Sequence, residues 1–173
     1  MLAHCLLNKS TRWWQDGKSI ERNMGLVEQV VSFALKNKIG IVQMPCPEFT
    51  FCGNPRPPRT KDEYEALPGF KEHCRKIADL VAEQLKILTS MSRKPRIRIL
   101  AVIGIKNSPS CATNSVLRKI NDKIQCSREK GVFIEILEKK MLKFGLKPLF
   151  LEFNFDRPSE IVKELNKIII DEV

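Results

Sequence analysis

The sequence predicts an α/β fold, a three-layer sandwich in which a mainly parallel sheet is covered by helices on both faces. Strand and helix patterns alternate along the chain, which is typical of such sheets. The segment RIRILAVIGI, residues 96–105, is the apolar run of a buried parallel strand. The length of 173 residues suits one domain of ordinary size. We therefore expect a single domain spanning residues 1–173.

The first half of the chain predicts two strands and two helices. MLAH, residues 1–4, leaves only four residues for a first strand. Apolar residues recur at helical spacing in residues 25–38, and IVQM at residues 41–44 follows as a strand. Prolines and a glycine predict an irregular loop over residues 45–60. An apolar residue at every third or fourth position from Phe70 to Leu88 predicts one long helix.

The second half continues the alternation after the strand at residues 96–105. Residues 112–131 are polar and basic with weak periodicity, so we expect a loop or a short helical excursion. VFIEILEKKMLKFG predicts a helix that stops at Gly145, and KPLFLEFNF predicts a strand. RPSEIVKELNKIIIDE predicts a last helix, which Ser159 can cap.

The formal net charge of +10 is concentrated in one part of the chain. Residues 93–130 hold ten Lys or Arg against two acidic residues, and NPRPPRTK at residues 54–61 adds further cations. Such clusters attract polyanions, nucleic acid first among them, although a solvated basic surface explains them as well. No apolar run has the length of a membrane span, and no secretory signal is present. We therefore expect a cytoplasmic protein without membrane contact, whose cysteines are thiols or metal ligands.

Three of the six cysteines directly follow predicted strands: Cys5, Cys46 and Cys111. Because the carboxyl ends of parallel strands meet at one edge of a sheet, these thiols can lie together. Three thiols in a reducing compartment suit a soft metal or an iron–sulfur cluster. Three unrelated buried cysteines are the alternative, as Cys74 illustrates on the apolar stripe of the long helix. Cys126 lies in the basic excursion, where we expect an exposed or loosely packed thiol.

Four motifs resemble those of the 2-thiouracil desulfurase family: HCLLN at residues 4–8, QMPCPE at 43–48, PGFKEHCRK at 68–76 and GIKNSPSC at 104–111. The first motif is most similar to the family's branch of thiouracil-desulfurase-related desulfidases. The resemblance extends from residue 4 to about residue 155. It implies a Rossmann-like domain that holds a [4Fe-4S] cluster through three cysteines and removes sulfur from thiolated nucleobases. The matching ligands here are Cys5, Cys46 and Cys111.

The same resemblance implies a catalytic pair, Glu48 of the CPE motif and Ser108, the first serine of SPSC. Glu48 would act as general base on a water or pass a proton, and Ser108 would hydrogen-bond the substrate or relay that proton. The cluster iron without a protein ligand would act as a Lewis acid on the C=S bond. Sulfur would depart as sulfide with no net redox change.

The sequence also departs from the family pattern. Arg12 keeps its expected offset from Cys5, whereas Asp16 is displaced by two residues. We carry both over, with Asn8, as candidate substrate-binding residues, although Asn8 could instead cap the following turn. Ala112 occupies the place of the family's glycine after SPSC and requires a negative φ.

The leading functional hypothesis is a non-redox, [4Fe-4S]-dependent desulfidase acting on a thiolated pyrimidine. The substrate could be a free base, a nucleoside or a thiolated tRNA, and the basic region of residues 93–130 favours tRNA. Two other classes remain open: a non-catalytic iron–sulfur or metal-binding module, and a Rossmann-like RNA-binding domain whose thiols are incidental. The sequence gives no oligomeric state.

Overall fold

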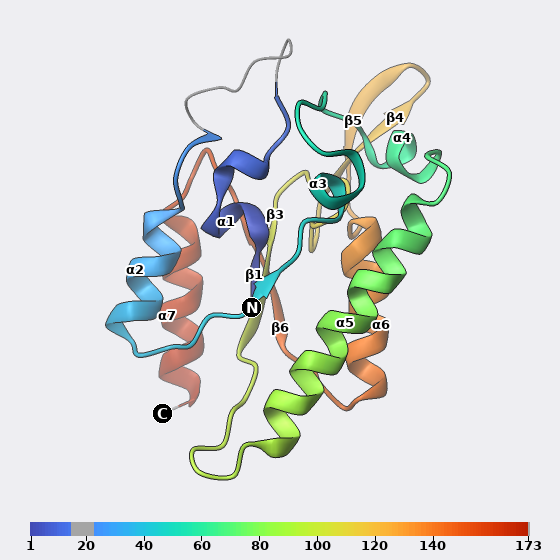
Figure 1. Cartoon of the computed structure of the whole chain (residues 1–173). Helices are drawn as coiled ribbons and strands as arrows, with labels where there is room; N and C mark the ends of the chain where they lie inside the picture. Colours follow the sequence, from blue (N-terminus) through green and yellow to red (C-terminus); the bar gives the residue numbers. More distant parts are fainter. Residues whose placement is uncertain (15–22, 173) are drawn as a thin grey trace.

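The computed structural model describes residues 1–14 and 23–172, and these form a three-layer α/β sandwich (Figure 1). Its central sheet has four parallel strands in the order β2–β1–β3–β6. The predicted fold class is confirmed. The four strands are β1 (Leu2–Ala3), β2 (Gln43–Met44), β3 (Ala101–Ile105) and β6 (Leu149–Phe153).

Strand β3 is the centre of the sheet. All five of its residues are buried, and it pairs with β6 over its full length, from Ala101 opposite Leu149 to Ile105 opposite Phe153. The first strand is as short as predicted, because β1 has only two residues. The prediction of a strand from residue 96 was wrong for residues 96–100, since neighbouring β1 begins opposite Ile103 and supplies no earlier partner.

Two helices cover each face of the sheet (Figure 1). Helices α2 (Glu28–Lys36) and α7 (Glu160–Glu172) lie on one face, and α5 (Phe70–Met91) and α6 (Val132–Lys143) on the other. These confirm the four predicted helices. Gly145 follows α6 with a φ of +72°, the left-handed conformation that favours glycine after a helix. Among the described helices, none is long and apolar enough to cross a membrane.

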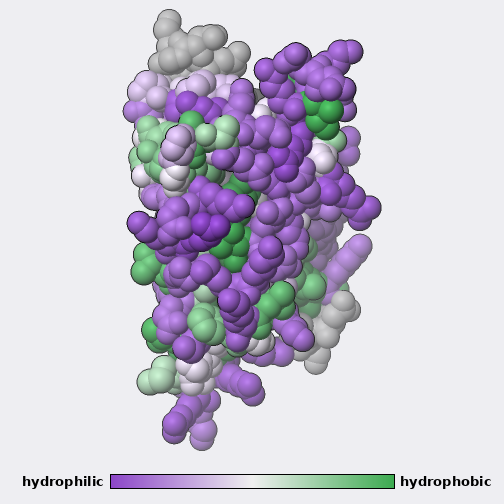
Figure 2. Space-filling view, turned by 90° about the vertical axis from the view of Figure 1, so that its right-hand side faces the viewer, coloured by the Kyte–Doolittle hydropathy of each residue, from purple (hydrophilic) through white to green (hydrophobic). Residues whose placement is uncertain are grey.

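The hydrophobic core lies between the sheet and the helices. The apolar stripe of α5 is buried as predicted, including Cys74 at 0% exposure. Full burial of one large apolar side chain contributes about 1.5–3 kcal/mol, so this stripe stabilises the sandwich strongly. The outer surface on the side of α5 and α6 is mainly hydrophilic, with separate hydrophobic areas (Figure 2).

Residues 45–60 are not wholly irregular, which corrects the prediction for this segment. Helix α3 (Pro47–Cys52) begins inside it. Pro47 stands at the first helical position, where its missing N–H group costs nothing, and Glu48 is favourable in the first turn. Cys46 caps the helix, its Sγ accepting from the backbone N–H of Phe49 at 3.4 Å. Proline starts a helix here.

Three short helical elements flank this region. The segments α1 (His4–Leu7) and η1 (Lys9–Thr11) follow β1 at once. Helix α4 (Lys61–Glu65) starts from a capping box in which Thr60 and Glu63 satisfy each other's backbone N–H groups. The spacing Thr-x-x-Glu is the sequence signal for this start.

Residues 112–131 contain a β-hairpin, so the prediction of a loop or helical excursion was wrong. Strands β4 (Val116–Ile120) and β5 (Lys123–Ser127) pair antiparallel through a two-residue turn. Asn121 and Asp122 form that turn with φ values of +49° and +59°, which these two residue types tolerate better than most. Most of β5 is exposed, so the hairpin carries little of the apolar alternation by which strands are recognised.

Arg118 attaches the hairpin to α4. Its guanidinium contacts Glu129 at 2.7 Å, Asp62 at 2.9 Å and Glu65 at 2.8 Å. The hydrogen bonds from Arg118 lower the pKa of Glu129 to about 2. The stabilisation from this shift is present above pH 4.5, the ordinary pKa of Glu129, and is lost as the pH falls toward 2.

Lys61→Met should destabilise the fold. Lys61 is 1% exposed, and its Nζ donates to Glu129 and Glu135, each at 2.8 Å. Because both carboxylates are partly exposed, we expect a loss of about 1–3 kcal/mol, less than for a fully buried pair. Chemical denaturation measures the loss. Lys86→Met, at an exposed pair with Glu83, is the control and should stay within about 0.5 kcal/mol of wild type. Equal stability of both variants would contradict the burial argument.

Candidate active site

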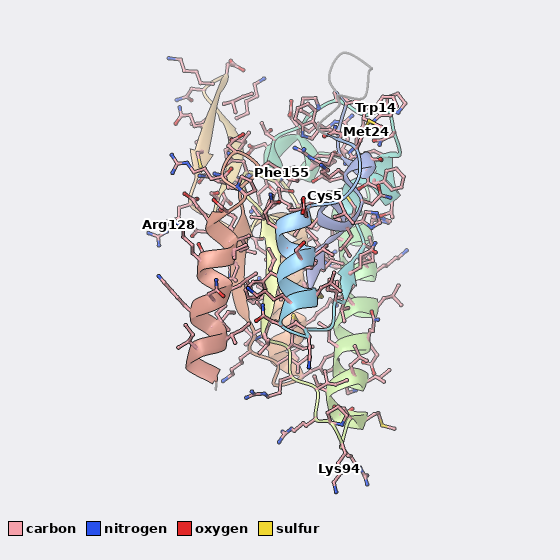
Figure 3. The ribbon with its side chains drawn as sticks, turned by 90° about the vertical axis from the view of Figure 1, so that its left-hand side faces the viewer. Cys5, Trp14, Met24, Lys94, Arg128 and Phe155 are labelled. Carbon is pink, nitrogen blue, oxygen red and sulfur yellow. The ribbon has the colours of Figure 1, made fainter. Side chains whose placement is uncertain are left out.

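A cavity of about 300 Å³ lies at the carboxyl end of the parallel sheet. Segments that follow all four strands line it, so side chains distant in sequence share one wall. Cys5 and Phe155, both on this wall, lie near each other at the upper end of the sheet in Figure 3. The cavity lining includes six residues predicted from the sequence: Cys5, Arg12, Cys46, Glu48, Ser108 and Cys111.

The three candidate ligand cysteines reach the cavity from three strands. Cys5 lies in α1 after β1, Cys46 caps α3 after β2, and Cys111 ends the SPSC loop (Ser108–Cys111) after β3. Burial raises the pKa of the Cys5 and Cys46 thiols to about 12 and that of Cys111 well above its ordinary value. Cys46 also raises the pKa of Cys5 and of Cys111, and Cys5 raises the pKa of Cys111. The positive charge of Arg12 lowers the pKa of Cys5, and that of Arg56 lowers the pKa of Cys46, but burial outweighs both.

This donor set fits a soft metal centre by its chemistry. Three thiols face one cavity, and two of the three residues, Cys46 and Cys111, are less than 10% exposed. Within the described residues, no group of three or more His, Cys, Asp or Glu side chains could hold a metal ion. A cubane cluster is larger than a single metal ion, and its cysteine sulfur ligands lie about 6–7 Å apart. The [4Fe-4S] cluster therefore stays a prediction.

Glu48 and Ser108, the predicted catalytic pair, lie in contact. Glu48 is 7% exposed, and its Oε1 accepts hydrogen bonds from Ser108 Oγ at 3.3 Å and Ser110 Oγ at 2.5 Å. Its Oε2 accepts from Arg56 Nη2 at 3.4 Å. Burial lowers the pKa of Arg56, but the charge of Glu48 and other neighbours more than offsets this, so the net shift is upward. An ion pair therefore forms one wall of the cavity.

Backbone hydrogen bonds from α6 and β3 fix the SPSC loop in place. At the start of α6, Val132 N donates to Pro109 O at 3.0 Å and Phe133 N donates to Ser110 O at 3.1 Å. These donors belong to the first turn of a helix, where backbone N–H groups lack partners within the helix. Ile105 N donates to Cys111 O at 3.2 Å and ties the loop's end to β3.

Glu152 of β6 holds the segment after the loop. Its Oε1 accepts from the backbone N–H groups of Thr113, Asn114 and Ser115 at 3.2, 2.9 and 3.0 Å. Its Oε2 accepts from Ser115 Oγ at 2.7 Å. A carboxylate with several such donors is a strong local anchor.

Ala112 fits the backbone of this region without strain. It is fully buried, and its N–H donates to Ser108 O at 3.3 Å. Four described non-glycine residues have a positive φ, and Ala112 is not one of them. The left-handed residue is Asn107, with a φ of +63°, immediately before the loop. The backbone conformation at position 112 therefore does not require the glycine of the family pattern.

The three candidate substrate-binding residues have different positions. Arg12 lines the cavity, with its Cζ 3.9 Å from the centre of the Phe155 ring. Asn8 accepts from Ser10 N at 3.2 Å and caps η1, and it is not among the residues lining the cavity. Asp16 lies outside the described residues.

Sequence reasoning missed three residues of this site. Phe155 follows the strand KPLFLEF, so the strand-end rule that selected the cysteines could have found it. Arg56 was assigned to an exposed basic cluster, yet it is 4% exposed and faces Glu48. Ser110 is 0% exposed, and no spacing rule singles it out.

The basic region of residues 93–130 is not one surface. Its first cations, including Lys94, lie in the turn before β3 at the lower end of the molecule, away from Cys5 (Figure 3). Farther along this region, Lys106 after β3 and Leu117 of the hairpin line the cavity. Arg118 of the hairpin is engaged by three carboxylates. The region therefore does not form one basic surface beside the site.

Comparison with known proteins identifies the family of the chain. Over residues 1–156 the chain matches the family described as "Putative 2-thiouracil desulfurase". The chain therefore belongs to this desulfurase family. It is also 27% identical over 171 residues, 98% of this chain and 95% of the relative, to an uncharacterized protein of Methanocaldococcus jannaschii. No solved structure matches the chain.

Gly131→Ala should disrupt the SPSC loop. A Cβ at Gly131 would lie 2.4 Å from the backbone C and O atoms of Ser110, so backbone atoms would have to move. We expect a loss of about 1–3 kcal/mol in the free energy of unfolding, measured by chemical denaturation. The matched control is Gly40→Ala, where the added Cβ meets nothing within 4 Å. Wild-type stability of Gly131→Ala would show that the loop has no fixed position against α6.

Proposed function

We propose that this protein is a cytoplasmic, [4Fe-4S]-dependent desulfidase that removes sulfur from a thiolated pyrimidine and releases it as sulfide. One observation carries the proposal: three thiols, a buried carboxylate and a serine hydroxyl from the ends of three strands line a single cavity. Membership of the desulfurase family supports the same reaction class. The net reaction is C=S + H₂O → C=O + H₂S, which balances without an oxidant or reductant.

Cys5, Cys46 and Cys111 would hold the cluster. When bound, the cluster supplies a Lewis-acidic iron for the thiocarbonyl sulfur. The protein must provide the thiols as thiolates for such binding, and Arg12 and Arg56 favour that charge state at Cys5 and Cys46.

Glu48 is the group best placed to move a proton. It lines the cavity beside Ser108, so its carboxylate can take a proton from a water that attacks the thiocarbonyl carbon. Ser108 Oγ accepts from Cys111 N at 3.0 Å, which fixes its lone pairs while its proton points toward Glu48. Ser108 can therefore hydrogen-bond the substrate or relay the proton to the leaving sulfur.

The cavity is suited to a flat heterocycle. Phe155 with Arg12 stacked at 3.9 Å provides an aromatic and cationic surface, and Trp13 lines the same wall. A volume of about 300 Å³ is at the small end of ligand sites. Free base, nucleoside and thiolated tRNA remain the candidate substrates. Steeply salt-dependent tRNA binding would favour tRNA, and fast turnover of 2-thiouracil without tRNA affinity would favour the free base.

The two other functional classes make different predictions. A non-catalytic iron–sulfur or metal-binding module would retain metal and release no sulfide from any thiolated base. An RNA-binding domain with incidental thiols would be unaffected by Cys46→Ala in iron content and in every activity. The convergence of the thiols with Glu48 and Ser108 is the observation that favours the enzyme over both.

Anaerobic reconstitution should give iron, acid-labile sulfide and a broad absorbance band near roughly 400 nm. Single replacements of Cys5, Cys46 or Cys111 by alanine should abolish most of this signal, because each removes one of three ligands. Cys126→Ala is the control and should load like wild type, since Cys126 is exposed on the hairpin. A colourless wild-type protein after reconstitution would count against the cluster.

Glu48→Gln should keep the iron and lose turnover. The amide preserves the shape of the side chain but cannot accept a proton as a base, so sulfide release should fall about 10²- to 10⁴-fold. Iron analysis and a sulfide-release assay on one reconstituted sample separate the two effects. Loss of iron in this variant would assign Glu48 a structural role.

A further inference from the structure

We propose that Ser110, the second serine of SPSC, is a positioning residue that holds Glu48 in its working orientation. This inference rests on the proposed function, in which Glu48 moves the proton. Ser108 and Ser110 both approach Glu48 Oε1, but the distances are 3.3 Å and 2.5 Å. The shorter and more buried contact belongs to the serine that does not line the cavity.

The hydroxyl proton of Ser110 has one good acceptor. Within hydrogen-bonding reach lie Glu48 Oε1 at 2.5 Å and Cys111 Sγ at 3.6 Å. A carboxylate oxygen at the shorter distance is much the stronger acceptor. Because a hydroxyl has a single proton, Ser110 donates to Glu48 and leaves Cys111 Sγ available for another bond.

The backbone of Ser110 is itself immobilised. Its carbonyl accepts from Phe133 N at 3.1 Å and Ile134 N at 3.2 Å, both in the first turn of α6. Gly131 packs so closely against Ser110 that a Cβ would lie 2.4 Å from its backbone. Ser110 therefore transmits the rigid position of α6 to the carboxylate on α3.

The two carboxylate oxygens are then restrained from opposite sides. Ser110 holds Oε1, while Arg56 Nη2 contacts Oε2 at 3.4 Å. Arg56 is fixed in turn, since its Nη1 donates to Asn54 Oδ1 at 2.7 Å. With both oxygens restrained, the carboxylate plane cannot rotate freely, and Glu48 faces the cavity in one orientation.

The serines thus divide two tasks. Ser108 lines the cavity, and its longer contact to Glu48 leaves its proton able to move toward a bound substrate. Ser110 is 0% exposed and is not among the residues that line the cavity. Its hydroxyl reaches Glu48 Oε1 and Cys111 Sγ, so it acts through these neighbours.

Kinetics of Ser110→Ala test the positioning role. We expect kcat for sulfide release to fall about 10- to 100-fold, the effect of one hydrogen bond to a charged group. KM should stay within about twofold, because Ser110 is not part of the cavity lining. Iron content should equal that of wild type. Wild-type kcat in Ser110→Ala would overturn the proposal, and so would a loss of iron that accounts for the whole defect.

Ser115→Ala is the matched control. It removes a buried hydroxyl that donates to another carboxylate, Glu152, at 2.7 Å and lies five residues after Ser110. It should lower the free energy of unfolding and leave kcat within about twofold of wild type. A fall in kcat equal to that of Ser110→Ala would mean that loss of any nearby buried hydroxyl damages the site, which contradicts a specific role for Ser110.

A double-mutant cycle gives a readout that needs no turnover. The free energy of unfolding is measured for wild type, Ser110→Ala, Glu48→Ala and the double variant, all without cofactor. If Ser110 holds Glu48, replacing one of them lowers the free energy of unfolding much less when the other has already been replaced. If the unpaired Arg56 prevents folding of Glu48→Ala, the same cycle is measured with Arg56→Met present in all four proteins. If the losses in the free energy of unfolding simply add, the two side chains do not interact, and the proposal is overturned. Coupling in a protein that releases no sulfide would instead refute the proposed function and leave the contact standing.

Discussion

The site depends on the close approach of the SPSC loop to two neighbouring segments. A Cβ at Gly104 of β3 would lie 2.0 Å from Cys111 O, and one at Gly131 would lie 2.4 Å from the Ser110 backbone. With hydrogen at both positions, the loop is enclosed between β3 and α6. This enclosure places Ser108, Ser110 and Cys111 opposite Glu48, which enters from α3. The close packing of two glycines against the loop backbone therefore determines how the loop's side chains lie relative to Glu48.

Most of the fold was predictable because its signals are local and periodic. The long apolar stripe of α5 and the apolar run of β3 each extend over enough residues to identify their element. The hairpin was missed because it gains its position from ion pairs, such as those of Arg118, and buries few apolar side chains. Helix α3 was missed because its segment is rich in proline, a composition that predicts an irregular loop. Pro47 is in fact favourable, since it stands at the first helical position.

The candidate site was predictable to the extent that topology determines it. Parallel strands end at one edge, and this rule alone placed Cys5, Cys46 and Cys111 around one cavity. Ser110 and Arg56 could not be found in this way, since their roles depend on side-chain directions set by tertiary packing. The charge of Arg56 suggested a surface residue, but the partner carboxylate that permits its burial is eight positions away in sequence and on another element.

In the proposed reaction, water replaces sulfur at a cavity built from these strand ends. The most direct test is turnover of 2-thiouracil by the anaerobically reconstituted protein in H₂¹⁸O, with mass spectrometry of the product and quantitation of sulfide. We predict one ¹⁸O atom in each uracil formed and one sulfide released for each thiobase consumed. Uracil without ¹⁸O, sulfur retained in stoichiometric amounts on the protein, or no conversion of any thiolated pyrimidine tested in the same way would contradict a hydrolytic desulfidase.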